Sequence, residues 1–319
     1  MFSELPKLIG RAFLIGQVLP GTLLTFGLWS AFAPGTIIDT IKLANGVSGT
    51  AAALVILWLV AIALSAINRP LIRLLQGYPF RPLTWAAKRA YAREAAPYFA
   101  EAARLEAARQ TDPTAKPKLP DLNGGLQRAV THYPDAPRFL LPTSLGNIMR
   151  AYEVYPRILY GLDSVPAWPR IVEVLPKETL SRLEESRGLL NFGANLVFAS
   201  TVVVLATLLS RLMNPPHPIH SNLLSLAILS HPLGWAVARN AAHTWGDQCR
   251  AVFDLHRGDL AEALGLILPS DPAQERIMWR AFSRMTLYRL PSAADELARF
   301  RAPQTAEAQT YKTNEDHLP

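Results

Sequence analysis

Four stretches of the chain combine apolar residues with an absence of Asp, Glu, Lys and Arg over a length that can cross a bilayer. They are Ala12–Ala33, Val47–Ile67, Gly188–Ser210 and Ile219–Ala238. At 1.5 Å per residue, about 20 helical residues span the roughly 30 Å hydrocarbon core. Because backbone groups in lipid must pair internally, we predict four transmembrane helices. The fourth is the least apolar, since it contains Asn222, His231 and Pro232.

The first stretch also has the features of a secretory signal peptide. Lys7 and Arg11 precede it, and Ala31, Phe32 and Ala33 resemble a small-residue cleavage site. Such peptides have an apolar region of about 7 to 15 residues, which is shorter than this stretch. Retention as a membrane anchor is therefore the preferred interpretation.

The distribution of basic residues predicts the orientation of the spans. Most of the 32 Lys and Arg residues lie between the second and third spans or after the fourth. Arg69 and Arg73 directly follow the second span, and Arg182 and Arg187 directly precede the third, close enough for the positive-inside rule to apply. The N-terminus, the long loop and the C-terminal tail are therefore predicted to be cytoplasmic.

Outside the spans the chain is also predicted to be helical, so the expected fold is all-α, a four-helix transmembrane anchor with a helical cytoplasmic loop and C-terminal extension. The segment Trp85–Arg109 is rich in Ala, Glu, Arg and Lys, which favour helix, and Pro97 is expected to break or kink it. The predicted regions are 1–67 (transmembrane helices 1 and 2), 68–187 (cytoplasmic, with a linker near 111–125), 188–238 (helices 3 and 4), 239–301 (cytoplasmic extension) and 302–319 (disordered tail).

A polar face is predicted on a helix in the cytoplasmic loop, with Thr143 or Ser144 as its N-cap. Its members recur three or four residues apart and are Asn147, Arg150, Glu153 and Arg157. A solvated face of ion pairs is the favoured interpretation, because such surface pairs are common and contribute little stability. The alternative is a docking site.

A second polar stripe follows the fourth span at spacings of three and four. Its members are His243, Asp247, Arg250, Asp254 and Arg257. We predict one long helix that runs from the fourth span through this stripe, with pairing inside the helix as the favoured interpretation and an interaction surface as the alternative. Beyond it, Ser270 or Asp271 is expected to cap a shorter helix with Pro272 in an early position.

Composition and charge narrow the class of protein. Hydrophobic residues make up 50% and charged residues 18%, which departs from the usual soluble balance. The net charge of +7 is also found in nucleic-acid-binding proteins, but here aromatic residues beside basic ones are better explained by anchoring at a membrane surface, so no nucleic acid partner is predicted. The single cysteine, Cys249, excludes an internal disulfide.

No motif indicates a specific reaction, and no catalytic residue, cofactor or metal is predicted. Nucleotide-binding glycine loops, the nucleophile elbow and the metalloprotease helix motif are absent from the sequence. His217 and His220 lack a third ligand for a zinc site, and Cys249 lacks an evident base. Gln17 and His231 are intramembrane polar candidates; for His231 a polar contact with a neighbouring helix is favoured over a proton relay.

Several short blocks resemble a family of uncharacterised bacterial multi-pass membrane proteins. They are LPTSLGN, Glu153, YGLDS and WPR within Leu141–Arg170, and FDLHR, LP and ER within Ala251–Trp279. These blocks cover under a quarter of the chain, and many members carry a charged residue where this chain has Ser144. The resemblance implies the bacterial cytoplasmic (inner) membrane and a shared cytoplasmic module, and it implies no activity.

Three functional hypotheses follow. The preferred one is a structural or signalling membrane anchor whose cytoplasmic module binds a protein partner or another copy of the chain, with the lipid bilayer as its other partner. The second is an oligomeric channel or transporter with a path lined by the first span and His231. The third is an enzyme acting on lipid, with the polar face from Asn147 to Arg157 as its site.

Overall fold

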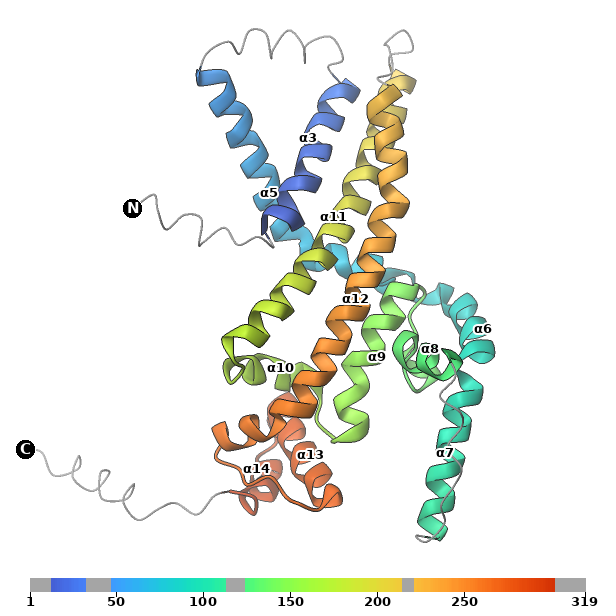
Figure 1. The fold of residues 1–319 in the computed structure, drawn as a ribbon, viewed down its shortest axis with the longest axis vertical. Helices are drawn as coiled ribbons and strands as arrows, with labels where there is room; N and C mark the ends of the chain where they lie inside the picture. Colours follow the sequence, from blue (N-terminus) through green and yellow to red (C-terminus); the bar gives the residue numbers. More distant parts are fainter. Residues whose placement is uncertain (1–12, 33–46, 113–123, 214–220, 302–319) are drawn as a thin grey trace, which may run out of the picture. The chain divides into compact units, whose positions relative to one another are not determined.

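The computed structural model describes residues 13–32, 47–112, 124–213 and 221–301, which are mostly helical (Figure 1). In chain order the helices are η2 (Leu14–Val18, a π-helix), α3 (Leu19–Phe32), α5 (Val47–Leu75), η3 (Tyr78–Thr84), α6 (Trp85–Glu94), α7 (Ala96–Thr111), α8 (Gly124–His132), η4 (Pro137–Phe139), α9 (Ser144–Leu159), α10 (Ser164–Glu173), α11 (Lys177–Met213), α12 (Ser221–Ala263), α13 (Pro272–Tyr288) and α14 (Pro291–Ala298). These described residues contain no strand and a single isolated bridge, between Leu266 and Arg301. The predicted all-α fold is confirmed.

The chain divides into two compact units. The first unit contains residues 1–152 and 181–248, and the second unit contains residues 153–180 and 249–319. Helices α9, α11 and α12 contribute residues to both units. The predicted boundaries at residues 67, 187 and 238 mark where the chain is expected to leave or enter the membrane. They are therefore not boundaries between compact units. The predicted linker and disordered tail lie largely outside the described residues.

Among the described residues, three helical stretches are long and apolar enough to cross a membrane. They are Leu14–Phe32, Ala51–Glu94, which runs from α5 into α6, and Lys177–Met213. Helix α12 is not among them, although it is long enough, because Asn222, Ser230 and His231 lower the mean hydropathy of its first half. It is nevertheless one continuous helix, as predicted for the fourth span and the polar stripe that follows it. The fourth span itself stays a prediction.

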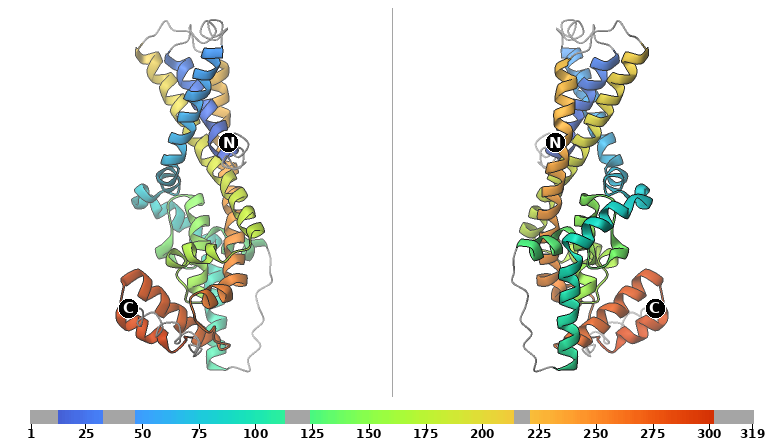
Figure 2. Two further views of the ribbon diagram at one scale, coloured as in Figure 1. Left: turned by 90° about the vertical axis from the view of Figure 1, so that its left-hand side faces the viewer. Right: turned by 90° about the vertical axis from the view of Figure 1, so that its right-hand side faces the viewer.

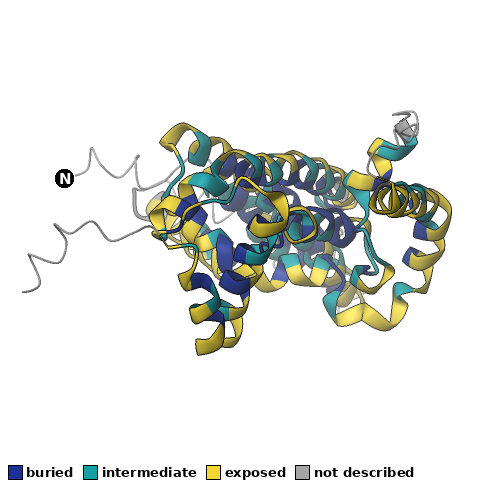
Figure 3. Cartoon of the chain, turned by 90° about the horizontal axis from the view of Figure 1, so that it is seen from below, coloured by how far each residue is buried: buried dark blue, intermediate teal, exposed yellow. Residues whose placement is uncertain are grey.

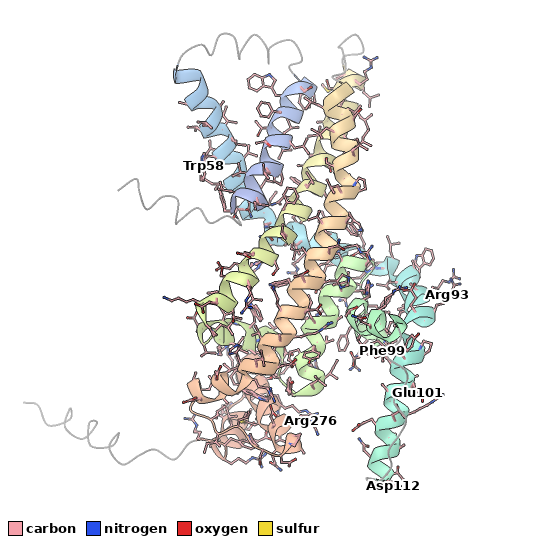
Figure 4. All side chains as sticks on the ribbon, in the orientation of Figure 1. Trp58, Arg93, Phe99, Glu101, Asp112 and Arg276 are labelled. Atoms are coloured by element: carbon pink, nitrogen blue, oxygen red, sulfur yellow. The ribbon has the colours of Figure 1, made fainter. Side chains whose placement is uncertain are left out.

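Helices α3 and α5 make contact at a glycine. A Cβ atom built on Gly21 would lie 3.6 Å from Val60 Cγ1 and 3.7 Å from Leu64 Cδ1, so side chains of α5 rest on the backbone of α3. Trp58, labelled in Figure 4, stacks on Phe13 with ring centroids 5.6 Å apart. Only 17% of the apolar part of the stretch Ala51–Glu94 is buried. Such an exposed apolar surface is typical of a helix that faces lipid.

Helices α11 and α12 cross at a pair of glycines within the first unit, where they lie side by side (Figures 1 and 2). A Cβ atom on Gly193 would lie 2.5 Å from Ala238 N and 2.7 Å from Gly234 O. A Cβ atom on Gly234 would lie 3.0 Å from Gly193 O. The two backbones are therefore in direct contact, which is the usual role of small residues between membrane helices.

Prolines have different effects at different positions. Helix α6 ends at Glu94 and α7 starts at Ala96, with Pro97 in the first turn of α7, so the predicted break is confirmed. Figure 4 shows Phe99 and Glu101 on α7, with Asp112 at its end. Pro70, in contrast, lies inside α5, which continues to Leu75 beyond the predicted end of the second span.

Two predicted helix caps are present. Of the two candidates for α9, Thr143 forms the cap, since its Oγ1 accepts a hydrogen bond of 3.0 Å from Gly146 N. The same hydroxyl donates to Leu75 O at 2.8 Å and so joins the start of α9 to the end of α5. Asp271 caps α13, because its Oδ1 accepts from Ala273 N at 3.0 Å. Both caps satisfy otherwise free N–H groups of the first turn.

The core of the second unit is aromatic. Trp279 and Phe282 of α13 are buried with Phe253 of α12, and the Trp279 and Phe282 rings form an edge-to-face pair with centroids 5.8 Å apart. Figure 3 shows helices with buried and exposed faces. Edge-to-face ring pairs contribute beyond their buried area, so this core is expected to be rigid.

Candidate functional site

Most of the predicted interaction residues fall in the second unit, and Asp254 lies at the centre of their polar network. Its carboxylate accepts hydrogen bonds from Tyr155 Oη at 2.9 Å and from Tyr160 Oη at 2.7 Å. The guanidinium of Arg250 lies 5.7 Å from the Tyr155 ring centroid. Helix α9 and the residue after it are therefore fixed to α12 by two hydroxyl groups that share one carboxylate.

The two tyrosines keep their protons throughout the physiological range. Burial, followed by the hydrogen bond to Asp254, raises the pKa of Tyr160 to about 12. The same two causes, in the same order, raise the pKa of Tyr155. Both hydroxyls therefore remain donors, and Asp254 remains their acceptor. This arrangement is suited to holding helices together rather than to proton transfer near neutral pH.

Arg257 extends the network toward α13. Its Nε donates to Glu275 Oε1 at 2.8 Å, and Trp279 Nε1 donates to the same oxygen at 3.2 Å. The guanidinium also lies over the Tyr160 ring, 4.3 Å from its centroid, and donates to the backbone oxygen of Asp254. Glu275 is buried. Since a buried carboxylate is costly without such partners, Arg257 has a structural role in this unit.

Sequence blocks that are far apart in the chain contact one another in this unit. Ser283 Oγ accepts a hydrogen bond of 2.9 Å from Asp163 N, and the Trp168 and Phe253 rings lie 6.1 Å apart. Gly161 has a φ of +76°, and a Cβ atom there would lie 2.7 Å from Arg276 O. Only glycine fits both the backbone conformation and the space at this position.

A cavity of about 600 Å³ opens within the second unit, between the end of α9, the start of α10, α13 and α14. Its lining combines basic, acidic and apolar side chains. The lining residues are Arg157, Gly161, Asp163, Ile277, Arg280, Ser283, Arg284, Leu287, Tyr288 and Glu296. We call it the basic cavity, because three arginines face two carboxylates.

The charges in the basic cavity are unequally neutralised. Arg284 pairs with Glu296, which also pairs with Arg299. Asp163 caps α10 by accepting a hydrogen bond from Val165 N at 3.1 Å. Arg157 and Arg280 form no hydrogen bond or ion pair with any described residue. Two free guanidinium groups therefore remain at the surface of the cavity.

Arg157 was predicted as a candidate, whereas Arg280 and Arg284 were missed. Arg276, Arg280 and Arg284 recur every four residues along α13 and therefore follow one side of the helix; Figure 4 labels Arg276. This repeat was the available signal. The sequence could not show that one of these arginines is paired while another is free.

The remaining predicted interaction residues belong to the first unit or to its boundary. Asn147 is buried, and its Oδ1 accepts a hydrogen bond of 2.7 Å from Leu141 N. Arg150 is half-buried, with its guanidinium 5.7 Å from the Tyr78 ring centroid. Asp247 is exposed on α12, and Glu153, the first residue of the second unit, is half-buried. Asn147 therefore holds the segment before α9 in place.

The two intramembrane candidates have contrasting surroundings. Gln17 is 5% exposed on the π-helix η2, and its Oε1 has no hydrogen-bond partner among the described residues. His231 is exposed on α12, where its Nδ1 lies 3.2 Å from Thr201 Oγ1 and 3.4 Å from Ser200 Oγ on α11. His231 thus makes polar contact with the neighbouring helix.

In the part of the chain that the structure describes, no three His, Cys, Asp or Glu side chains are close enough together to hold a metal ion. His217 and His220 lie outside the described residues. Comparisons of the chain with protein-family models, with curated proteins and with solved structures gave no match. The function must therefore be inferred from the geometry of the molecule.

Proposed function

We propose that the chain is a membrane anchor of the structural or signalling type, and that its second unit is a cytosolic module that binds an acidic segment of a protein partner. The three apolar helical stretches support the anchor. The observation that carries the proposal is the pair of free guanidinium groups, Arg157 and Arg280, in one cavity of about 600 Å³.

The lining of the basic cavity matches the chemistry of an acidic peptide. Guanidinium groups bind carboxylates through two parallel hydrogen bonds. Ile277, Leu287 and Tyr288 provide an apolar wall for aliphatic side chains next to those carboxylates.

The cavity is held in shape by bonds inside the second unit. Asp254 fixes the end of α9 through two tyrosines, and the Asp163 N–H fixes the start of α10 to Ser283 of α13. A preformed site loses little conformational entropy when a ligand binds. Asp254 and Arg257 of the predicted polar stripe thus stabilise the fold of the second unit and do not line the cavity.

The hydrogen bonds of the predicted polar residues weaken the hypothesis of an enzyme acting on lipid. That hypothesis needs the predicted polar residues to be available in a cleft. In the predicted polar face, the Asn147 side chain already accepts a hydrogen bond from Leu141 N. In the polar stripe, Asp254 accepts from two tyrosine hydroxyls, and Arg257 is bonded to Glu275 and to the Asp254 backbone. These residues are committed to the fold and are not free to act on a substrate.

Photo-cross-linking in the native membrane tests the proposal. A photoreactive amino acid at Leu287, which lines the cavity, is expected to capture a protein partner. The same probe at Leu255, which is 74% exposed but does not line the cavity, is expected to capture much less. The captured region, identified by mass spectrometry, should be acidic.

Substitution of the free arginines provides the matched control. Arg157→Gln combined with Arg280→Gln should reduce the Leu287 cross-link by about tenfold or more, because charge-assisted hydrogen bonds are lost. Arg276→Gln removes the same charge from α13 outside the cavity lining and should leave the cross-link unchanged. An undiminished cross-link in the double variant would overturn the proposal.

A further inference from the structure

A second cavity, of about 500 Å³, lies within the first unit and plays no part in the function proposed above. Helices α6, α8, α9 and α12, all labelled in Figure 1, contribute to it. Its lining residues are Ala86, Ala87, Ala90, Glu94, Arg128, His132, Tyr133, Pro142, Ser144, Asn147 and Arg239. Small alanines form one wall, and hydrogen-bond donors from three helices form much of the rest.

Two arginines of this cavity have no anionic partner. Arg128 on α8 and Arg239 on α12 form no ion pair with any described residue. The Nε atom of Arg239 is buried and lacks a hydrogen-bond acceptor among those residues. The one carboxylate in the lining, Glu94, accepts a hydrogen bond of 2.9 Å from Tyr133 Oη. A buried donor without an acceptor is costly, so an acceptor supplied by an anionic ligand would stabilise this part of the cavity.

The other donors lie around the same space. Asn147 is 3% exposed, and because its Oδ1 accepts from Leu141 N, its amide nitrogen remains as the donor that a ligand in the cavity could use. Ser144 begins α9, whose N-terminal end carries the positive end of the helix dipole. His132 lies one helical turn from Arg128 on α8, and its protonated ring would supply a further donor.

We propose that this cavity binds a phosphate group. A carboxylate is satisfied by one guanidinium fork, whereas a tetrahedral phosphate presents more oxygens in several directions. Two guanidinium groups, an amide and a hydroxyl from three helices suit the larger anion. The phosphate comes either from a lipid headgroup or from a free phosphorylated compound, since both present the same chemistry.

The position of the cavity along the chain favours a lipid headgroup. Phe80, Leu83 and Trp85 follow α5 and are 49%, 55% and 60% exposed, as expected of side chains at a membrane interface. Arg239 directly follows the predicted fourth span. Basic pockets next to membrane helices are known to bind anionic lipid headgroups.

The test uses the full-length protein purified in detergent. Thermal unfolding is measured with inorganic phosphate and with chloride at matched ionic strength, and native mass spectrometry records phospholipid retained after extraction from phosphatidylglycerol or phosphatidylcholine vesicles. Selective stabilisation by inorganic phosphate supports the free ligand as the source. Retained phosphatidylglycerol without that stabilisation supports the headgroup.

Variants separate the cavity from other basic surfaces. Arg128 is exposed, so Arg128→Gln is expected to fold and to weaken phosphate or lipid binding by about tenfold or more. Arg239→Gln should have the same effect. Arg138→Gln, on the exposed 3₁₀ turn η4, should leave binding unchanged. The proposal is overturned if neither ligand binds the wild-type protein, or if binding is equal in all three variants.

Discussion

Single carboxylates hold the second unit together. Asp254 accepts two tyrosine hydroxyls, and Glu275 accepts both Arg257 Nε and Trp279 Nε1. Hydrogen bonds to charged groups contribute about 1.5–3 kcal/mol each, more than neutral ones. The contact of His256 with Asp259 on the same helix should contribute far less, because the Asp259 carboxylate is exposed to solvent.

Asp254→Ala is therefore expected to lower the free energy of unfolding by roughly 2–4 kcal/mol, since it leaves two half-buried tyrosine hydroxyls unpaired. Asp259→Ala should change it by less than about 0.5 kcal/mol. Urea unfolding followed by tryptophan fluorescence gives both values, because Trp168 and Trp279 lie in the affected unit. Equal effects of the two substitutions would argue against the role assigned to Asp254.

His132, which is half-buried on α8, has a pKa below the usual value for histidine. Burial lowers its pKa and the Arg239 charge lowers it further, while a hydrogen bond with the Arg128 backbone and the Glu94 charge act in the opposite direction. The His243 ring packs against it with centroids 4.3 Å apart. The unfolded chain therefore binds a proton at a higher pH than the folded chain does. This difference stabilises the fold above about pH 6.5, and the contribution is lost as pH falls through the lowered pKa.

We expect the melting temperature to fall between pH 7.5 and 5.5 more steeply in the wild type than in His132→Gln. Bound phosphate should reduce the fall, because an anion beside His132 favours the protonated ring. Differential scanning fluorimetry across this range measures both effects. A wild-type slope no steeper than that of the variant would show that His132 does not control the response.

Helix contacts depend on glycine at a few positions only. Gly193 on α11 touches the backbone of α12. A Cβ atom built on Gly258 of α12, in contrast, would have its nearest neighbour, Leu268 Cδ2, at 4.0 Å. The same substitution should therefore have opposite effects at the two positions. Close contact penalises an added methyl group, and an open helical position gains from the better helix propensity of alanine.

Gly193→Ala is expected to destabilise the protein by about 1–3 kcal/mol by forcing α11 and α12 apart. Gly258→Ala should stabilise it by about 0.5–1 kcal/mol or leave it unchanged. Thermal unfolding in one detergent compares the two variants directly. If Gly193→Ala were as stable as Gly258→Ala, the backbone contact would not be required.

Helix ends were predictable where they depend only on residues nearby in the sequence, such as a proline or a capping side chain. Pro97 lies in the first turn of α7, a position where a helix does not need the N–H group that proline lacks. Pro70 has the same backbone restriction but lies inside α5, which shows that a proline can be accommodated within a long helix. The Thr143 and Asp271 caps were predicted because a side-chain oxygen bonds an N–H only two or three residues away.

At the scale of the whole molecule, three candidate spans and a fourth predicted span imply different topologies. An even number of spans returns the C-terminal segment to the side of the N-terminus, and an odd number does not. The basic residues that flank the long loop favour its retention in the cytoplasm. The number of spans therefore decides where the second unit resides.

Reporter fusions distinguish the two topologies. With four spans, green fluorescent protein fused after Arg301 is expected to fluoresce, because it folds in the cytosol. Alkaline phosphatase inserted within residues 214–220 is expected to be active, because that connection would lie outside. If green fluorescent protein fused after Arg301 stayed dark, and alkaline phosphatase fused at the same position were active, α12 would not cross the membrane.

The sequence by itself determined the all-helical class, the apolar stretches, several helix caps and the continuity of α12. These features depend on the transfer of side chains to lipid and on bonds between residues a few positions apart, so they can be derived from local patterns. Only the tertiary structure decided which charges are paired. Asp254 meets two tyrosines from α9 and its end, and Arg280 stays free while Arg284 meets Glu296. Partners that are distant in the chain come together only through packing, which a local pattern does not contain.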